Sequence, residues 1–286
     1  MPDDILAGLP LVSVVIPTFA RRDLTQEAID SVLSQAGARL EVIVVDDGSG
    51  DGTLEALERR GPPVVPVPIP RCGRIGKVRN AGIRRARGVL IAFLDSDDVW
   101  LPGKLARQLD YLAAHPHVGA VYTDQYRMQG GRILPRTRFD DFPPRRRVLY
   151  RDTVRGLCVQ TSSVVVRREV FEVVGLFDED LLLYEDADMW SRISEHFEWG
   201  FVAAPLVIYR PDIDPAHVQT DERRTLREAW RYYERYVARR CRRPASPEED
   251  AGTARFLAGL MAVADTLGEP WPPGRGDAGP ESPVRG

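Results

Sequence analysis

The stretch VLIAFLDSDDVWLP, residues 89–102, joins an apolar run to three aspartates within four positions. The apolar run is typical of a buried strand, whereas Asp95, Asp97 and Asp98 repel one another unless something neutralises them. Oxygen ligands in an Asp-x-Asp spacing suit a hard divalent cation such as Mg²⁺ or Mn²⁺. The alternative is a turn whose aspartates cap the helix that follows Pro102, but one aspartate would be enough for that.

Outside this stretch, short apolar runs alternate with amphipathic segments. This alternation predicts an α/β fold with a mostly parallel central sheet flanked by helices. Strands are expected at residues 12–17, 41–47, 89–95 and 118–124, an edge strand or connector at 62–70, a closing strand pair at 200–210, and helices at 23–35, 53–60 and 186–197. Residues 127–155, rich in proline and arginine, are interpreted as an irregular excursion near a site. Helices at 221–240 and 252–267 form a C-terminal appendage.

Three acidic clusters lie at the ends of predicted elements. Asp46 and Asp47 follow the second strand, the aspartates at 95–98 follow a later central strand, and Glu185, Asp186 and Asp188 open a helix. The carboxyl ends of parallel strands share one rim, where ligands of open α/β sheets bind. Two carboxylates rarely complete a Mg²⁺ shell, which substrate phosphates and water usually fill. The pattern therefore predicts a diphosphate ligand.

The composition excludes several classes of function. The 286 residues carry 39 Lys plus Arg against 42 Asp plus Glu, a formal charge of -3, which argues against a nucleic-acid partner. Three cysteines without short spacing suggest neither a disulfide framework nor a zinc site and fit a reducing cytosol. No run approaches the roughly 20 apolar residues of a membrane span. We expect a cytoplasmic protein that rests on a membrane only through a partner or acceptor.

Four segments then carry a resemblance to a known family. They read VSVVIPTFARRDLTQEAIDSVLSQ, EVIVVDDGSGDGT, VRNAGIRRARGVLIAFLDSDDVWLPGKL and VFEVVGLFDEDLLLYEDADMWSRI. Their order and spacing resemble family 2 glycosyltransferases of the GT-A fold over residues 11–210. The resemblance implies a nucleotide-sugar-binding half at 1–125, an acceptor-binding half with the catalytic base at 126–212, a helical extension at 213–268 and a disordered tail at 269–286.

The resemblance also implies roles for individual residues. Asp95 and Asp97 would bind the divalent cation with the donor diphosphate, and Asp186 would be the catalytic base, with Glu185 supporting it. The residues assigned to the nucleotide are Pro17, Thr18, Phe19, Asp46, Asp47, Lys77, Arg79, Asn80, Ser96 and Asp98, with Asp98 serving the ribose or the metal.

Two observations leave alternatives open. The family's first motif commonly reads PTYNR, whereas this chain has PTFAR, so Phe19 lacks a hydroxyl and Ala20 lacks an amide. Asp186 precedes a buried helical stripe, so it could instead be an N-cap that accepts from the amides of the first turn.

The function expected from these residues is metal-assisted, inverting transfer of a sugar from a nucleotide-diphosphate sugar, most simply a UDP-sugar, to an acceptor hydroxyl. The acceptor would be a saccharide, a lipid-linked saccharide or a small molecule. The alternatives are a sugar-nucleotide nucleotidyltransferase, whose glycine-rich N-terminal loop is missing here, and a non-catalytic nucleotide-sugar binding or scaffold protein. The C-terminal helices could form a homodimer.

Overall fold

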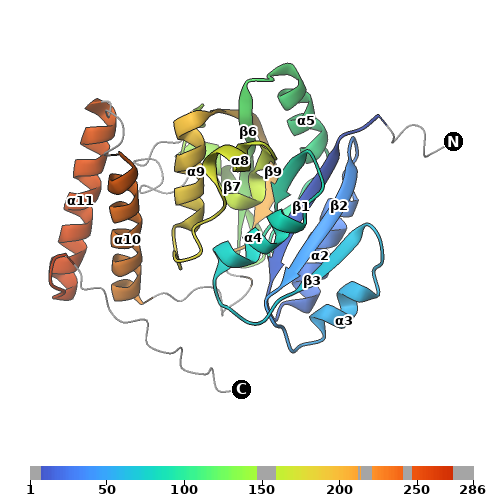
Figure 1. Ribbon diagram of the computed structural model, residues 1–286, viewed down its shortest axis with the longest axis horizontal. Coiled ribbons are helices and arrows are strands. Elements are labelled where there is room, and N and C mark those ends of the chain that lie inside the picture. The colour runs from blue at the N-terminus through green and yellow to red at the C-terminus, as the bar shows by residue number, and fades with distance from the viewer. Residues whose placement is uncertain (1–7, 147–158, 212, 214–220, 241–246, 273–286) are drawn as a thin grey trace. The chain divides into compact units, whose positions relative to one another are not determined.

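The computed structural model describes residues 8–146, 159–211, 213, 221–240 and 247–272 (Figure 1). The chain divides into two compact units, Met1–His217 and Val218–Gly286. The boundary between the two expected halves, at residues 125 and 126, falls inside the strand Val118–Gln129 of the first unit.

The described part of the first unit is built on a nine-stranded sheet with the order β3-β2-β1-β4-β8-β6-β9-β5, and β7 pairs with β6. Its strands are β1 Leu11–Thr18, β2 Arg39–Asp46, β3 Val64–Pro68, β4 Leu90–Phe93, β5 Val99–Trp100, β6 Val118–Gln129, β7 Arg132–Thr137, β8 Val165–Arg167 and β9 Glu198–Tyr209. Its helices are α2 Arg22–Leu33, α3 Thr53–Glu58, α4 Ile75–Arg85, α5 Lys104–Ala114, α6 Arg138–Asp141, α8 Val170–Val174 and α9 Glu185–His196, with a 3₁₀ turn η1 at Thr161–Ser163.

The first four strands in the sheet order confirm the predicted parallel arrangement. β1 lies between β2 and β4 and is parallel to both, and β3 is parallel to β2 at the sheet edge. The proline-rich run at residues 62–70 is therefore the predicted edge strand, where a missing N–H donor is tolerated. Because β1, β2 and β4 point the same way, their carboxyl ends share one rim.

Both faces of the sheet are covered, as expected for parallel strands. Alternate residues of β1 show why, since Val14 packs into the cluster that includes α2, α3 and α5, and Val15 packs into the cluster that includes α4, α8 and α9 (Figure 1). The strand register therefore fixes which helices stand on which face, and it positions the start of α9 near the rim.

Residues 127–155 were expected to be irregular, and this is wrong for the part that the structure describes. β6 runs to Gln129, and Gly130 and Gly131, both with positive φ, turn the chain into β7. Two consecutive left-handed residues fit a tight hairpin turn, which glycines allow without steric cost. Residues 147–158 lie outside the described part.

The closing segment at 200–210 is one strand, not the expected pair. β9 pairs with β6 over its length, but the register shifts between the pairs Thr123–Val202 and Asp124–Pro205. The extra residues of β9 bulge at this point, which keeps a proline in a paired strand. β5 was not predicted, because two residues carry no readable periodicity.

The second unit contains α10 Glu222–Arg240 and α11 Pro247–Leu267. The tail expected to be disordered from residue 269 starts with ordered contacts, because Glu269 forms a 3.0 Å ion pair with Arg223 and the Trp271 ring packs on Trp230. Residues 273–286 lie outside the described part. Among the described helices, none has the length and hydropathy needed to cross a bilayer.

The close packing of α4 on the sheet gives a stability prediction. A Cβ at Gly82 would lie 2.4 Å from Cγ1 of Val15 and 3.2 Å from Cγ2 of Val45, both on central strands. Gly82→Val should therefore lower the free energy of unfolding by about 2–3 kcal/mol, measured by urea unfolding. Gly50→Val is the control, because a Cβ there meets no atom within 4 Å. Equal stability of the two variants would contradict the packing.

Candidate active site

The candidate site lies at the rim where β1, β2 and β4 end. In the register of β1 and β2, Thr18 pairs with Asp46, and Asp95 follows directly after the end of β4 and Leu94. The first two acidic clusters of the sequence therefore follow β2 and β4, which lie on either side of β1 and end at the same rim.

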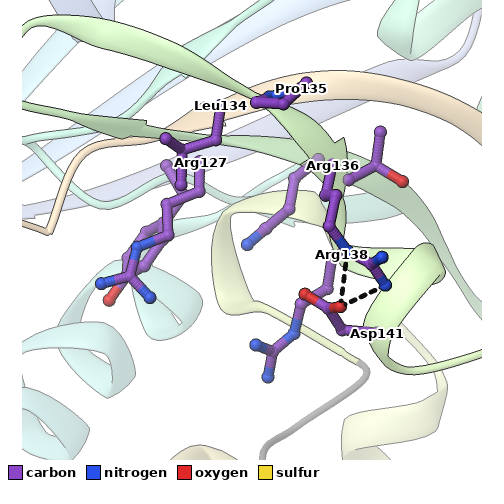
Figure 2. Close-up of a pocket in the computed structure, with 9 residues that line it drawn as sticks. Arg127, Leu134, Pro135, Arg136, Arg138 and Asp141 are labelled. Carbon is purple, nitrogen blue, oxygen red and sulfur yellow. Dashed lines mark hydrogen bonds and ion pairs between the residues drawn. The ribbon is translucent and has the colours of Figure 1, made fainter.

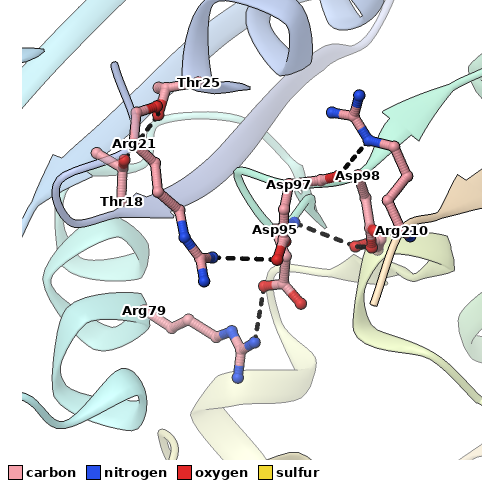
Figure 3. A network of polar contacts seen from close by, with 9 residues as sticks. Thr18, Arg21, Thr25, Arg79, Asp95, Asp97, Asp98 and Arg210 are labelled. Atoms are coloured by element: carbon pink, nitrogen blue, oxygen red, sulfur yellow. Dashed lines mark hydrogen bonds and ion pairs between the residues drawn. The ribbon is translucent and has the colours of Figure 1, made fainter. Parts of the chain in front are cut away.

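Arginines from different elements hold the aspartates of residues 95–98 (Figure 3). Nη2 of Arg79, on α4, donates to Oδ1 of Asp95 at 2.8 Å, and Nη1 of Arg21, which precedes α2, donates to Oδ2 of Asp97 at 3.1 Å. The Asp95 side chain is 33% exposed and that of Asp97 only 5%. Asp95 is therefore the more accessible of these two carboxylates.

Asp98 is enclosed in the protein. Its Oδ2 accepts a 2.5 Å hydrogen bond from Oγ of Ser162 in η1, and its Oδ1 accepts from the backbone N–H of Arg210 at 3.0 Å. Burial, together with the charges of Asp97 and Asp95, raises the pKa of Asp98 well above its usual range. These contacts connect residues 95–98, called the aspartate turn below, to η1 and to the residue after β9. Asp98 therefore stabilises the local structure in addition to its predicted contact with ribose or metal.

Arg79 links the aspartate turn to the third acidic cluster. Its guanidinium is buried and donates from Nη1 to Oε1 of Glu185 at 2.6 Å while also bonding Asp95. Burial alone would lower the pKa of Arg79, but Asp95, Glu185 and Asp186 raise it above its usual value. The cation is thus permanently charged and shared between two segments more than 80 residues apart in the sequence.

Asp186 lies in the first turn of α9, half-buried. The N-cap position is Tyr184, at a φ of 66°, so Asp186 is not the N-cap that the alternative reading required. Its Oδ1 accepts from the N–H of Ala187 at 2.7 Å and its Oδ2 accepts from Oγ1 of Thr161 at 3.3 Å. Burial raises the pKa of Asp186, which the charge of Arg79 opposes.

Glu185 is more buried than Asp186, at 7% exposed. Burial and the charge of Asp186 raise its pKa to about 7, although Arg79 acts in the opposite direction. Two adjacent carboxyl groups with raised pKa values beside a buried arginine are typical of sites that handle protons.

The loop after β2 is fastened to the segment before α4. Oδ1 of Asp47 accepts from the N–H of Cys72 at 2.8 Å and its Oδ2 accepts from the N–H of Gly73 at 2.9 Å, while Arg71 also pairs with Asp47. Asp46 accepts from the N–H of Ser49 at 3.1 Å. Both aspartates are buried, and their carboxylates hold the loop after β2 in place through these hydrogen bonds.

The remaining predicted nucleotide residues fall into two groups. Pro17, Thr18 and Phe19 stay at the rim: Thr18 shares a 2.7 Å hydroxyl bond with Thr25, and the exposed Phe19 ring lies 3.7 Å under the Arg71 guanidinium. The hydroxyl and the amide that PTFAR lacks have no counterpart in this Arg71–Phe19 contact.

Three others are not part of the carboxylate network. Asn80 holds the chain before α9, because its amide bonds the backbone of Phe177 at 2.9 Å in both directions and Oε1 of Glu179 at 2.9 Å. Lys77 is exposed on α4, and Ser96 is buried within the aspartate turn. The structure therefore brings together Asp95, Asp97, Arg79, Glu185 and Asp186, and gives Asn80 a supporting contact.

Sequence reasoning missed four residues that complete the site: Arg21, Thr161, Ser162 and Arg210. Arg21 lies in the PTFAR segment and Arg210 ends a predicted strand. The sequence therefore indicated where each residue lies, but no local pattern predicted which residues it contacts. Arg210 also donates from Nε to the carbonyl of Asp97 and from Nη1 to Glu27 at 2.6 Å.

The donor atoms at this site fit a divalent cation that takes part of its shell from a substrate. The ligands are carboxylate oxygens, and Asp95, Asp97, Asp98, Glu185 and Asp186 are five acids against the three guanidinium groups of Arg21, Arg79 and Arg210. Within the described residues, no three His, Cys, Asp or Glu side chains form a ready-made ligand set. Mg²⁺ commonly uses one or two carboxylates with substrate phosphates, so the arrangement suits it.

Solved structures share this fold. The structure of S. aureus TarS 1-349 in complex with UDP-GlcNAc superposes with a TM-score of 0.68 at 20% identity, covering 90% of this chain and 73% of that one. The mannosyltransferase PcManGT from Pyrobaculum calidifontis, in complex with GDP-Man and Mn²⁺, gives 0.62 at 20% identity over 91% and 79%. The architecture is accordingly the GT-A type of α/β fold.

Sequence comparison points the same way. An uncharacterized glycosyltransferase of Rickettsia bellii is 30% identical over 196 residues, which is 67% of this chain but only 28% of the relative, so the chain spans less than a third of that protein. The model of glycosyl transferase family 2 matches residues 13–175, more than half of the chain. With the sheet order and the rim carboxylates, this match shows that the chain belongs to glycosyl transferase family 2.

Proposed function

We propose that the protein transfers a sugar from a nucleotide-diphosphate sugar to an acceptor hydroxyl with inversion at the anomeric carbon. The observation that carries the proposal is the bridge made by Arg79. Its guanidinium donates both to the accessible carboxylate of Asp95 and to Glu185 at the start of α9. The same rim thereby offers a site for a diphosphate and a carboxylate that can take a proton.

Asp186 is the proposed catalytic base. Its carboxylate is half-buried, and it is held by Thr161 and by the N–H of Ala187. A raised pKa brings a carboxylate closer to the range in which it accepts a proton efficiently at neutral pH. Asp186 removes the proton of the acceptor hydroxyl as that oxygen attacks the anomeric carbon, and the bond to the diphosphate oxygen breaks on the opposite side.

Asp95 and Asp97 are the proposed cation ligands, and Arg79 faces the departing nucleoside diphosphate. A bound Mg²⁺ or Mn²⁺ stabilises negative charge on the leaving group and orients the diphosphate. Glu185 fixes the Arg79 guanidinium through its 2.6 Å bond, so that the arginine keeps one orientation during transfer. Asp46, Asp47 and the rim residues of β1 form the wall for the nucleoside.

A UDP-sugar is the proposed donor, supported by the UDP-GlcNAc in the TarS structure. The Mn²⁺ beside GDP-Man in PcManGT supports a divalent cation in this fold and keeps guanosine donors in the test. A cytoplasmic location, association with a membrane through the acceptor and a dimer through the C-terminal helices stay predictions.

The test is a panel of UDP-, GDP- and dTDP-sugars with Mn²⁺ or Mg²⁺, scored by release of the nucleoside diphosphate with and without hydroxyl acceptors. We expect release from one donor class, lost on addition of EDTA and lowered at least ~100-fold by Asp97→Asn. Asp110→Asn, at an exposed carboxylate of α5, is the matched control and should keep full activity. Pyrophosphate release from a sugar phosphate and a nucleoside triphosphate would instead identify a nucleotidyltransferase.

Asp186→Asn should lower transfer by about 100- to 10,000-fold, the range expected when a general base is lost. Donor binding should stay within threefold, because the variant keeps the shape of the side chain at a position outside the proposed cation ligands. Isothermal titration with UDP and Mn²⁺ measures binding, and product formation measures transfer. Glu172→Gln, exposed on α8, is the control. Full transfer by Asp186→Asn would exclude the base role.

The raised pKa of Glu185 predicts a pH dependence of stability. Because the folded-state pKa of about 7 exceeds the ordinary 4.5, the folded protein binds more protons in this window. The contribution of Glu185 to the free energy of unfolding is therefore complete below about pH 4.5 and is lost as the pH rises through about 7. Glu185→Gln should remove this fall, measured as the difference between urea-unfolding curves at pH 5, 6, 7 and 8. Parallel profiles of variant and wild type would refute it.

A further inference from the structure

A cavity opens near the carboxyl end of β6, next to the carboxylate site. It has a volume of about 230 Å³ and is lined by β6, β7, α6 and the last residue of β9 (Figure 2). Sites for drug-sized ligands have volumes of about 300–1,000 Å³. The cavity is smaller than these, so it has room for a single ring of a substrate.

Strand directions place the cavity at the same rim as the carboxylates. β4 and β6 both pair with β8 in antiparallel fashion, so β6 points the same way as β4. β9 is parallel to β6, and Arg127 pairs with Tyr209 near the ends of these two strands. The next residue, Arg210, donates its backbone N–H to Oδ1 of Asp98 at 3.0 Å. Adjacent residues of the chain therefore line the cavity and contact the aspartate turn.

Tyr209 lies within electrostatic reach of both regions. Burial raises the pKa of its phenol, the charge of Asp98 raises it further, and Arg127 acts in the opposite direction. Asp95 and Asp97 also raise this pKa. The Tyr209 wall of the cavity is therefore close enough to the aspartate turn for the two to bind parts of one reacting complex.

Gln125 brings an unsatisfied hydrogen-bond acceptor to the cavity. It lines the cavity and is only 3% exposed, and its Oε1 has no hydrogen-bond partner among the residues that the structure describes. The strand around it is fixed, because Oδ1 of Asp124 accepts from the N–H of Gln125 at 2.8 Å and from that of Phe139 at 2.9 Å. A buried carbonyl oxygen without a donor costs free energy, so a ligand that donates a hydrogen bond is favoured here.

The other walls combine an aromatic ring with apolar and polar groups. Gln125 lies two residues before Arg127, and Arg127 pairs with Tyr209, so all three side chains belong to one face of the sheet. Leu134 and Pro135 of β7 add apolar surface (Figure 2). An apolar and aromatic wall with a few polar groups is typical of a site for a small ligand. A sugar ring fits this wall, because its C–H groups pack on the aromatic ring while its hydroxyls donate hydrogen bonds.

The order of the sites along the sheet indicates which substrate enters the cavity. The proposed nucleoside wall belongs to β1 and β2, and the proposed cation ligands follow β4, whereas the cavity lies beyond β8, on β6 and β9. In an in-line displacement the attacking hydroxyl enters opposite the diphosphate that leaves. A cavity on the side of the diphosphate away from the nucleoside wall is therefore placed for the acceptor.

We propose that this cavity binds a sugar ring of the acceptor, which makes the acceptor a saccharide, and that Oε1 of Gln125 accepts a hydrogen bond from one of its hydroxyls. A hydroxyl can donate this bond, whereas an ionised phosphate or carboxylate has no hydrogen to donate. Gln125 is thereby a specificity residue for the acceptor. The acceptor role rests on the proposed function, whereas binding of a sugar ring by the cavity does not.

Sugar binding is tested without a donor, in EDTA, so that no nucleotide or cation takes part. The probes are the methyl glycosides of glucose, N-acetylglucosamine, galactose and mannose, and glycerol is the acyclic comparison. Saturation-transfer difference NMR measures their binding. We expect a saturable signal from at least one glycoside and none from glycerol.

Two variants remove different walls of the cavity. Gln125→Leu should weaken glycoside binding about tenfold, since a hydrogen bond is lost. Tyr209→Leu removes the aromatic ring and should also weaken it. Gln129→Leu is the matched control, because Gln129 is an exposed glutamine of β6 that does not line the cavity. Gln125→Leu should keep the wild-type stability in urea unfolding, because it removes a buried polar atom that has no partner among the described residues.

The transfer assay then tests the acceptor role. Gln125→Leu should raise the KM of a saccharide acceptor about tenfold and leave the KM of the donor unchanged. A rise in the donor KM alone would assign the cavity to the donor sugar and overturn the acceptor role. Binding of no glycoside, or equal binding by Gln125→Leu and Gln129→Leu, would overturn the proposal even where nucleoside diphosphate release shows an active transferase. Glycoside binding that depends on Gln125, without such release from any donor, would overturn the transfer function and leave the sugar site standing.

Discussion

The site depends on one buried guanidinium group, that of Arg79. Arg79 joins the end of β4 to the start of α9, and without it the carboxylates of Asp95, Glu185 and Asp186 would stand close together in a partly dry environment. Removing one partner of such a buried cluster leaves uncompensated charge, which is costly. The geometry of the rim is therefore an electrostatic balance, in which one guanidinium holds carboxylates that come from two elements.

Much of this architecture could be predicted from the sequence because its signals are local. Buried strands that end in aspartates predict both the parallel sheet and the rim at which the acidic clusters meet, and the motif order indicates the family that the family match confirms. The hairpin of β6 and β7 shows where local reasoning failed. The Gly130–Gly131 pair was a turn signal, but the prolines and arginines around it suggested an irregular segment, whereas pairing with β6 decides the structure.

Partners far apart in the sequence could not be predicted in the same way. Arg21 reaches Asp97 across 76 positions and Arg210 reaches the same turn across more than 110, and no periodicity records such pairs. Asn80, which the motif position assigns to the nucleotide, also has intramolecular partners that the sequence did not indicate, because its amide bonds residues 177 and 179. Residue type and strand position locate a site, while the pairing inside it follows from the tertiary structure.

The aspartate turn crosses the sheet, and this has a consequence for recombining such enzymes. It leaves β4 in the middle of the sheet and ends in β5, which pairs only with β9 at the opposite edge. β8, from much later in the chain, lies between β4 and β6. A chimera that exchanges residues 1–125 between relatives would therefore separate strands that pair with each other in this sheet. An exchange that keeps the strand pairing intact therefore includes β8 and the end of β9 together with the amino-terminal strands.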